Sequence, residues 1–182
     1  MLIFTHTSSP RLQYICKFIF AEQLNCAYSL TTHAESFQNH DGPKINYSDT
    51  AFNDASLQLI PHPLLFEANI TTQATICFEL NAEKAFFKSG PDYGFDIFAA
   101  SFYLISRYEE YLPHKKDMYG RFAHEHSLAF KEGFLNTPLV NKWIMEFAMH
   151  LQRRFPSFSY HLNKYSFLPT YDIDIAWSYK NK

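Results

Sequence analysis

The chain has 182 residues, of which 47% are hydrophobic and 19% are charged, and its formal net charge is -2. These values are typical of a globular protein and exclude a disordered or fibrous chain. Lysine and arginine are spread along the sequence, so no basic cluster indicates nucleic-acid binding. A chain of this length can bury about 70% of the surface that its unfolded form exposes, so stability gives no reason to expect a disulfide or a structural metal.

The sequence carries no recognisable signal for export or membrane insertion. Residues 1–6 are a short apolar run without a basic leader or a small-residue cleavage site. No segment approaches the roughly 18 uninterrupted apolar residues of a membrane span. We therefore expect a cytoplasmic chain with no membrane span. Its cysteines, which are Cys16, Cys26 and Cys77, are odd in number and lack CxxC spacing, so we expect buried thiols.

Aromatic residues are unusually frequent, at 18% of the chain with 19 phenylalanines and 12 tyrosines. We expect most of these rings to fill the core or to contact another domain. Exposed aromatic side chains can also form a stacking surface for carbohydrate, so carbohydrate stays a second candidate partner.

The first 30 residues predict a strand, a helix and a second strand. Residues 2–5 are typical of a short buried strand, and Ser8-Ser9-Pro10 predicts a helix cap followed by proline in the first turn. The helix should run to about Asn25, because Leu12, Ile15, Ile19 and Phe20 recur at three- and four-residue intervals. With a second strand at 27–30, this is the opening of a βαβ unit.

The middle of the chain predicts further short strands at 44–47, 57–60 and 75–80, whose pairing order the sequence does not determine. Residues 95–111 then predict a buried helix capped by Asp96. At its end, Arg107 and Glu110 are spaced to form an ion pair. Adjacent Glu109 and Glu110 point about 100° apart on a helix, so we interpret them as a solvated helix end and not as catalytic carboxylates.

Residues 111–134 contain turn and charge signals and predict an exposed loop. A second clear helix should begin at Thr137-Pro138 and end before Pro156, with Arg153 and Arg154 in its last turn. Its apolar positions recur every four residues, at Leu139, Trp143, Phe147, Leu151 and Phe155. Together these elements predict an α/β fold with a small parallel or mixed sheet flanked by helices.

The last segment changes to a strand-like pattern and ends in two acids, which suggests a domain boundary near Asn163 that divides the chain into 1–163 and 164–182. In Thr170-Tyr171-Asp172-Ile173-Asp174, the two aspartates are two residues apart, so on a strand both carboxylates would share one face. One carboxylate could then bind a metal while the other accepts a proton. Taken alone the pattern is weak, because Asp-x-Asp at a strand end is also common in turns and caps.

The segment LPTYDIDIAWSYK resembles the first motif of bacterial polysaccharide deacetylases, which ends the first strand of their catalytic barrel. Residues Phe95 to Phe122 and Gly133 to Trp143 resemble the region that precedes the catalytic domain in one branch of these proteins. The resemblance implies that Asp172 is the general base and that Asp174 is a ligand of a divalent metal, commonly zinc. It also implies that residues 164–182 are the first strand and start of a deacetylase barrel whose remainder is missing here.

The chain departs from the deacetylase pattern in its histidines. The family's second motif has two histidines four residues apart, and none of the nine histidines here has that spacing. A catalytic zinc normally has three protein ligands, so we expect no tightly bound metal in this fragment and no activity from it alone. The only close pair is in His124-Glu125-His126, which we interpret as surface or hydrogen-bonded groups because no third ligand is evident.

These observations predict an amino-terminal accessory domain of a metal-dependent deacetylase of amino sugars or acetylated polysaccharide. Its main partner would be its own downstream catalytic domain. The alternative is a free-standing, non-catalytic α/β binding module in which the final Asp-x-Asp is only an ordered tail.

Overall fold

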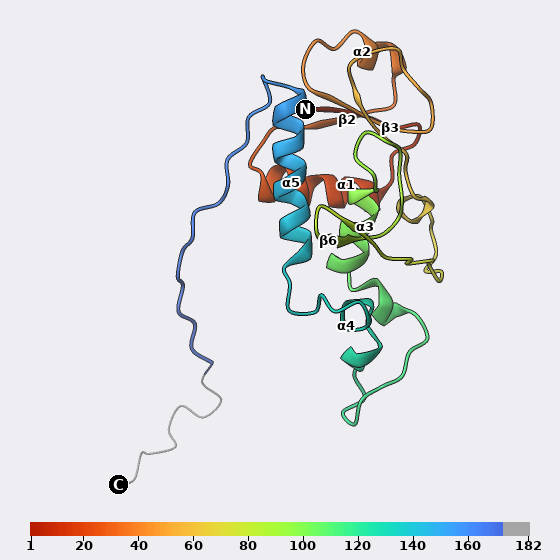
Figure 1. Ribbon diagram of the computed structural model, residues 1–182, viewed down its shortest axis with the longest axis vertical. Coiled ribbons are helices and arrows are strands. Elements are labelled where there is room, and N and C mark those ends of the chain that lie inside the picture. The colour runs from red at the N-terminus through yellow and green to blue at the C-terminus, as the bar shows by residue number, and fades with distance from the viewer. Residues whose placement is uncertain (173–182) are drawn as a thin grey trace.

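The computed structural model describes residues 1–172 and shows an α/β fold built on a four-stranded parallel sheet (Figure 1). The sheet has the order β2-β1-β3-β4, and all three pairings are parallel. A separate antiparallel hairpin follows. The strands are β1 (Leu2–Phe4), β2 (Ser29–Thr31), β3 (Lys44–Tyr47) and β4 (Leu57–Leu59), and the hairpin is β5 (Phe78–Leu80) with β6 (Glu83–Ala85).

Five α-helices and several short helical turns complete the described part of the chain. The α-helices are α1 (Pro10–Cys16), α2 (Ala34–Gln38), α3 (Ile97–Ile105), α4 (Leu128–Lys131) and α5 (Leu139–Arg154). A π-helical segment, η1 (Lys17–Gln23), continues α1, and short 3-10 turns occupy Pro63–Leu65, Tyr108–Tyr111 and His124–His126. Within residues 1–172, none of the helices has both the length and the apolar character that crossing a bilayer requires.

The predicted βαβ opening is confirmed. Ser9 caps α1, because its Oγ accepts a hydrogen bond from the Leu12 amide at 3.1 Å, and Pro10 occupies the first helical position. The helical path continues through η1 to Gln23, close to the expected end. The apolar stripe is fully buried at Leu12, Ile15, Ile19 and Phe20.

Helices cover both faces of the sheet. On one face, Ile3 and Tyr47 belong to the main core with α1, α3 and α5, and α3 contacts both of the other helices. On the other face, the Phe4 ring packs 5.4 Å from the Phe37 ring of α2. Because successive side chains of a strand point to opposite faces, neighbouring residues of β1 belong to different layers.

Aromatic rings join the three helices of the main core. The Phe98 ring of α3 lies 6.0 Å from the rings of both Phe20 and Phe147, and 5.1 Å from the Tyr47 ring of β3. The expected apolar line of α5 is buried at Leu139, Trp143, Phe147 and Leu151, while Phe155 is only partly buried. Aromatic rings therefore make up a large part of the core, beside buried leucine and isoleucine side chains.

The segment 111–134 differs from the predicted exposed loop. It contains α4 and a 3-10 turn, and the side chains of Leu128 and Phe134 are buried. Ser127 caps α4, and the half-buried Glu109 carboxylate accepts a hydrogen bond from the Leu128 amide at 2.8 Å. The solvated interpretation of Glu109 was therefore wrong, whereas the Arg107–Glu110 ion pair is confirmed.

Three smaller expectations also need correction. Cys16 is buried, but Cys26 and Cys77 are only partly buried. The strand expected at 75–80 forms at its end alone, as β5, which pairs with β6 in the antiparallel hairpin. Pro138 occupies the N-cap position of α5, and no side chain caps that helix.

After α5 the chain is anchored to the folded body and then leaves it. The His161 amide donates to the Leu24 carbonyl at 2.8 Å, and the Asn25 side-chain amide donates to His161 and to Asn163. Residues 164–172 are exposed and form no strand. The assignment of this segment to a following barrel stays a prediction, as does the division of the chain at 163.

Candidate functional site

Of the two acids named from the sequence, only Asp172 belongs to the described residues, at the end of the extended tail. Asp172 is the last described residue and is exposed, whereas Asp174 lies outside the described residues. Across residues 1–172, the structure brings no three side chains of His, Cys, Asp or Glu together in a group that could hold a metal. His124 and His126 lie in a surface 3-10 turn, where the His124 ring pairs with Glu125 at 3.5 Å.

The topology of the sheet points to a different place. The chain passes from β1 to β2 on one side of β1 and then to β3 on its other side, so the strand order reverses between β1 and β3. Ligands of open parallel sheets bind outside the carboxyl ends of the strands at such a reversal. A cavity of about 390 Å³ lies there, and the segments that line it are 5–7, 47–49, 60–61 and Phe66.

We call this cavity the sheet-edge pocket. Hydrogen bonds within the chain fix the loop that follows β3, which lines the pocket. The Asn46 side-chain amide donates to the Thr50 carbonyl at 2.7 Å, and the Ser48 hydroxyl donates to the Asn46 side-chain oxygen at 2.6 Å. Asn46 and Ser48 are both buried. The loop is therefore fixed by its own sequence, which is typical of a pre-formed binding site.

The rim of the sheet-edge pocket carries an imidazole and a carboxylate. The His6 Nε2 atom lies 2.9 Å from the Thr50 hydroxyl and 3.3 Å from the Asp49 carboxylate. A catalytic relay requires the acid on one ring nitrogen and the nucleophile on the other. Because both partners here meet the same nitrogen, this geometry can bind a polar group but does not form a triad.

Asp96 forms the buried support beneath the same region. Its carboxylate accepts hydrogen bonds from the Tyr47 hydroxyl and the His62 amide, both at 2.7 Å, and from the amides of Phe98 and Ala99, both at 3.0 Å. Burial raises the pKa of Asp96 to about 6, against the hydrogen bonds, which lower it. All four donors belong to the protein, so Asp96 is a structural group that joins the end of β3 to the start of α3.

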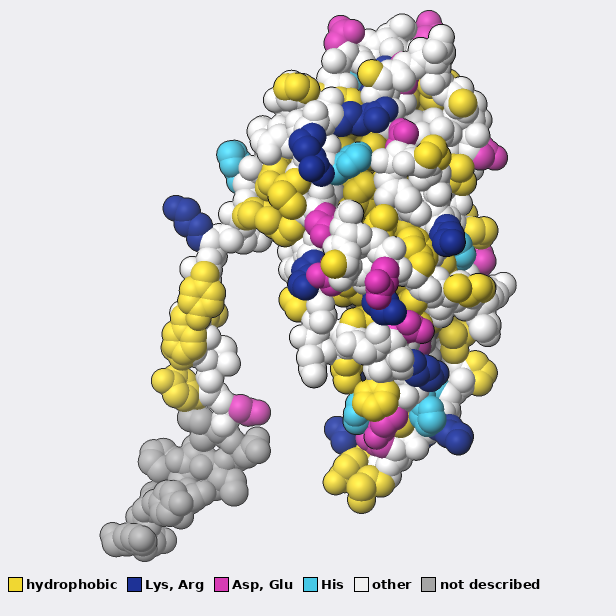
Figure 2. All heavy atoms as spheres, viewed as in Figure 1, with side chains coloured by type: hydrophobic (Ala, Val, Ile, Leu, Met, Phe, Trp, Pro, Cys, Tyr) yellow, Lys and Arg dark blue, Asp and Glu magenta, His cyan; other side chains and the backbone are white. Residues whose placement is uncertain are grey.

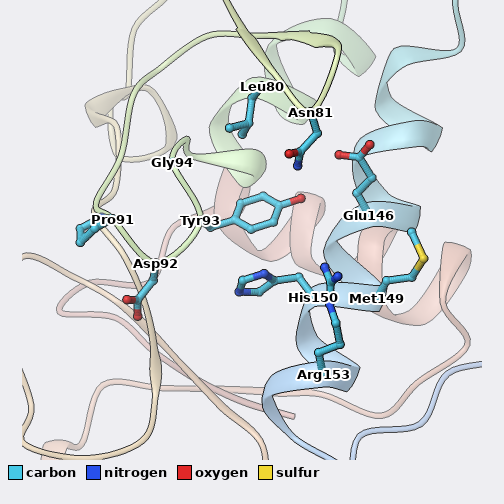
Figure 3. Close-up of a pocket in the computed structure, with 10 residues that line it drawn as sticks. All are labelled: Leu80, Asn81, Pro91, Asp92, Tyr93, Gly94, Glu146, Met149, His150 and Arg153. Atoms are coloured by element: carbon cyan, nitrogen blue, oxygen red, sulfur yellow. The ribbon is translucent and has the colours of Figure 1, made fainter.

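A second cavity, of about 410 Å³, lies between α5, the turn of the β5–β6 hairpin and the turn at 91–94 (Figure 3). We call it the α5 pocket. Glu146, His150 and Arg153 reach it from one face of α5, and Asn81 reaches it from the hairpin turn. No sequence motif indicated that any of these residues binds a ligand. Each lies in a helix or a turn whose sequence is explained by the fold alone.

The comparisons with known proteins give a family but no function. Residues 1–156 match the model of a family described as a family of unknown function (DUF7033). No curated protein and no solved structure matches the chain.

Proposed function

We propose that this chain, which belongs to the DUF7033 family of unknown function, serves as the amino-terminal accessory domain of a metal-dependent carbohydrate deacetylase-like hydrolase. The motif around Asp172 supports the hydrolase class, because it resembles the first motif of polysaccharide deacetylases. In this role Asp172 would act as the general base and Asp174 as a ligand of the metal.

The observation that carries the proposal is the exposed apolar tail before that motif. Four side chains of the tail are between 76% and 91% exposed: Tyr165, Phe167, Leu168 and Tyr171. Figure 2 shows hydrophobic side chains along the tail, clear of the folded body. Four large apolar side chains exposed within seven residues are unusual and mark a surface that another structure covers. A following catalytic domain, of which this segment would be the first strand, would cover it.

The metal site of this proposal cannot be completed from the described residues. One aspartate at the end of the tail is far short of the three protein ligands that a catalytic zinc normally has. The proposal therefore places the histidine ligands in the following domain. When bound there, a divalent metal would lower the pKa of a water molecule and polarise the acetyl carbonyl.

The proposal is tested by release of acetate. We expect no acetate release from acetylated chito-oligosaccharides by residues 1–182, and release by a protein that continues through the following domain, with zinc added to both. A third protein that begins at residue 164 distinguishes the catalytic role of the following domain from the accessory role of residues 1–163. It should still release acetate but should bind the polymer less tightly. Release by residues 1–182 alone, or a continuation with no histidine pair at four-residue spacing, would contradict the proposal.

The second candidate is a free-standing binding module. The observation that favours it is the sheet-edge pocket, whose loop is held by buried hydrogen bonds at the place where parallel sheets bind ligands. In that case the tail would belong to this domain instead of to another one. Thermal unfolding distinguishes the two candidates.

Removal of residues 164–182 should change the melting temperature by no more than about 2 °C, since 1 kcal/mol corresponds to roughly that shift in a chain of this size. Residues 164–172 are exposed, and none of them forms a hydrogen bond with the described body. As a control, removal of everything after Phe155 also deletes buried Phe158 and the His161–Leu24 bond, so it should lower the melting temperature clearly. A large drop for the shorter deletion would favour the free-standing module.

A further inference from the structure

We infer that the α5 pocket binds a neutral oligosaccharide through Asn81, Glu146 and Arg153. The inference deepens the proposed function and rests on it for the biological role of the ligand. The choice of ligand class follows from the chemistry of the pocket itself.

The three polar side chains have no partners of their own. Within residues 1–172, Asn81, Glu146 and Arg153 form no side-chain hydrogen bond or ion pair, although all of them line the same cavity. Figure 3 shows the Asn81 amide and the Glu146 carboxylate directed toward a common space beside the Tyr93 hydroxyl. Their hydrogen-bonding capacity is therefore available to a ligand.

The charges of the pocket balance, which disfavours an ionic ligand. Asp92 is already engaged, because its carboxylate accepts from the Gln58 amide at 2.9 Å and lies 3.5 Å from the Arg154 guanidinium. Burial lowers the pKa of His150, and the nearby arginines lower it further, so the neutral ring is favoured. One carboxylate, Glu146, and one guanidinium, Arg153, then remain.

A hydroxyl group suits this pair, because it can donate to a carboxylate and accept from a guanidinium or an amide. Glu146 and Arg153 are seven residues apart on α5, which separates them by about 10 Å along the helix axis. A ligand with several hydroxyl groups along its length can contact both side chains. An oligosaccharide has this form, and a single small ion can meet only one of the two charges.

The apolar part of the lining fits the C–H faces of sugar rings. The side chains of Leu80 and Met149 and the ring of Tyr93 line the cavity beside the polar groups. The Tyr93 ring is fixed from behind, because it stacks on Phe95 at 5.3 Å and meets Phe147 at 4.8 Å. Pockets with a few placed polar groups on an apolar wall are typical of small-ligand sites.

The wall of the pocket at 91–94 is also pre-formed. Gly94 has a φ of +93°, a conformation that side chains other than glycine rarely adopt, and a Cβ there would lie 3.4 Å from Leu80. The Gly94 amide donates to the Gly90 carbonyl at 3.0 Å, and its carbonyl accepts from the Ser89 amide at 3.1 Å. A rigid wall favours binding, since little order must be gained when the ligand enters.

Isothermal titration of residues 1–182 tests the inference. The ligands are the β-1,4-linked tetramers of glucose, xylose and N-acetylglucosamine, with inorganic sulfate and free glutamate as ionic alternatives. We expect at least one neutral tetramer to bind. Glu146→Gln and Arg153→Gln should each weaken this binding about tenfold, because each replaces a charged hydrogen-bonding partner by a neutral one.

The control variant is Glu35→Gln, which makes the same change as Glu146→Gln at an exposed position of α2 and should leave binding unchanged. Thermal unfolding of each variant verifies that the fold is intact. Absence of binding by every neutral tetramer, equal binding by wild type and both pocket variants, or binding of sulfate or glutamate alone would overturn the inference. None of these results changes acetate release by the extended protein, so the sugar site and the deacetylase proposal fail separately.

Discussion

Replacement of Asp96 by alanine should lower the free energy of unfolding by about 4 kcal/mol. The change removes a helix cap and leaves two buried hydrogen-bond donors without an acceptor. The side chain caps α3 through the amides of Phe98 and Ala99. It also accepts from the Tyr47 hydroxyl and the His62 amide in a fully buried setting. Urea denaturation followed by circular dichroism measures the change.

The Asp96→Asn variant is the matched control, because it keeps the size of the side chain. Its amide oxygen can still cap α3, and its NH₂ group can donate to the Tyr47 hydroxyl, which also accepts hydrogen bonds. Only the His62 amide then faces another donor. We expect a smaller loss of about 2 kcal/mol, consistent with one unsatisfied buried group. Equal stability of the alanine variant and wild type would show that the buried network contributes nothing.

Wild type and Asp96→Asn should differ in how their stability depends on pH. The folded-state pKa of Asp96, about 6, lies above the ordinary value of 3.8, so the folded protein binds this proton more tightly than the unfolded chain. The resulting stabilisation is fully present below about pH 4 and is lost as the pH rises through 6, by up to about 3 kcal/mol. The stability of wild type minus that of Asp96→Asn should therefore fall over this interval and be constant above it. A flat difference would contradict the raised pKa.

Local signals in the sequence predicted the elements that frame the fold. Ser9 and Pro10 mark the start of α1, and Asp96 marks the start of α3, because a cap acts within three residues of itself. The four-residue repeat from Leu139 to Leu151 likewise predicted the buried face of α5. These features depend on neighbours in the chain, which a single sequence displays directly.

Contacts between distant segments could not be predicted in the same way. Tyr47 and Asp96 are 49 residues apart, and nothing in either segment indicates the other. From the sequence, Glu109 has the pattern of a solvated acid. In the structure its carboxylate accepts a hydrogen bond from the Leu128 amide, 19 residues later, in the segment that was expected to be an exposed loop. The order of the strands likewise depends on long-range pairing, as the sequence pattern fixes only that strands exist.

The two pockets illustrate the same limit for function. Motif reasoning led to Asp172 and Asp174, which are two residues apart on the chain. The α5 pocket instead combines Asn81, Tyr93 and Glu146 from three segments, and none of these has a recognisable motif. Each residue also has an ordinary structural explanation, such as a turn or an exposed helix face. The shared cavity appears only when the chain is folded.

Replacement of Asp172 by asparagine in the protein that continues through the following domain should reduce acetate release by about 10²- to 10⁴-fold, the usual contribution of a general base. Asparagine matches the aspartate in size but cannot take the proton of the attacking water. The metal content of the Asp172→Asn variant should be unchanged, because Asp174 and not Asp172 is the proposed metal ligand.

Asp174→Asn should instead lose both metal and activity, as measured by elemental analysis and acetate release. Asp41→Asn, at another exposed carboxylate, should alter neither. Full activity in Asp172→Asn would contradict the role of Asp172 as the general base. Equal metal loss in both tail variants would make Asp172 a metal ligand and not a base.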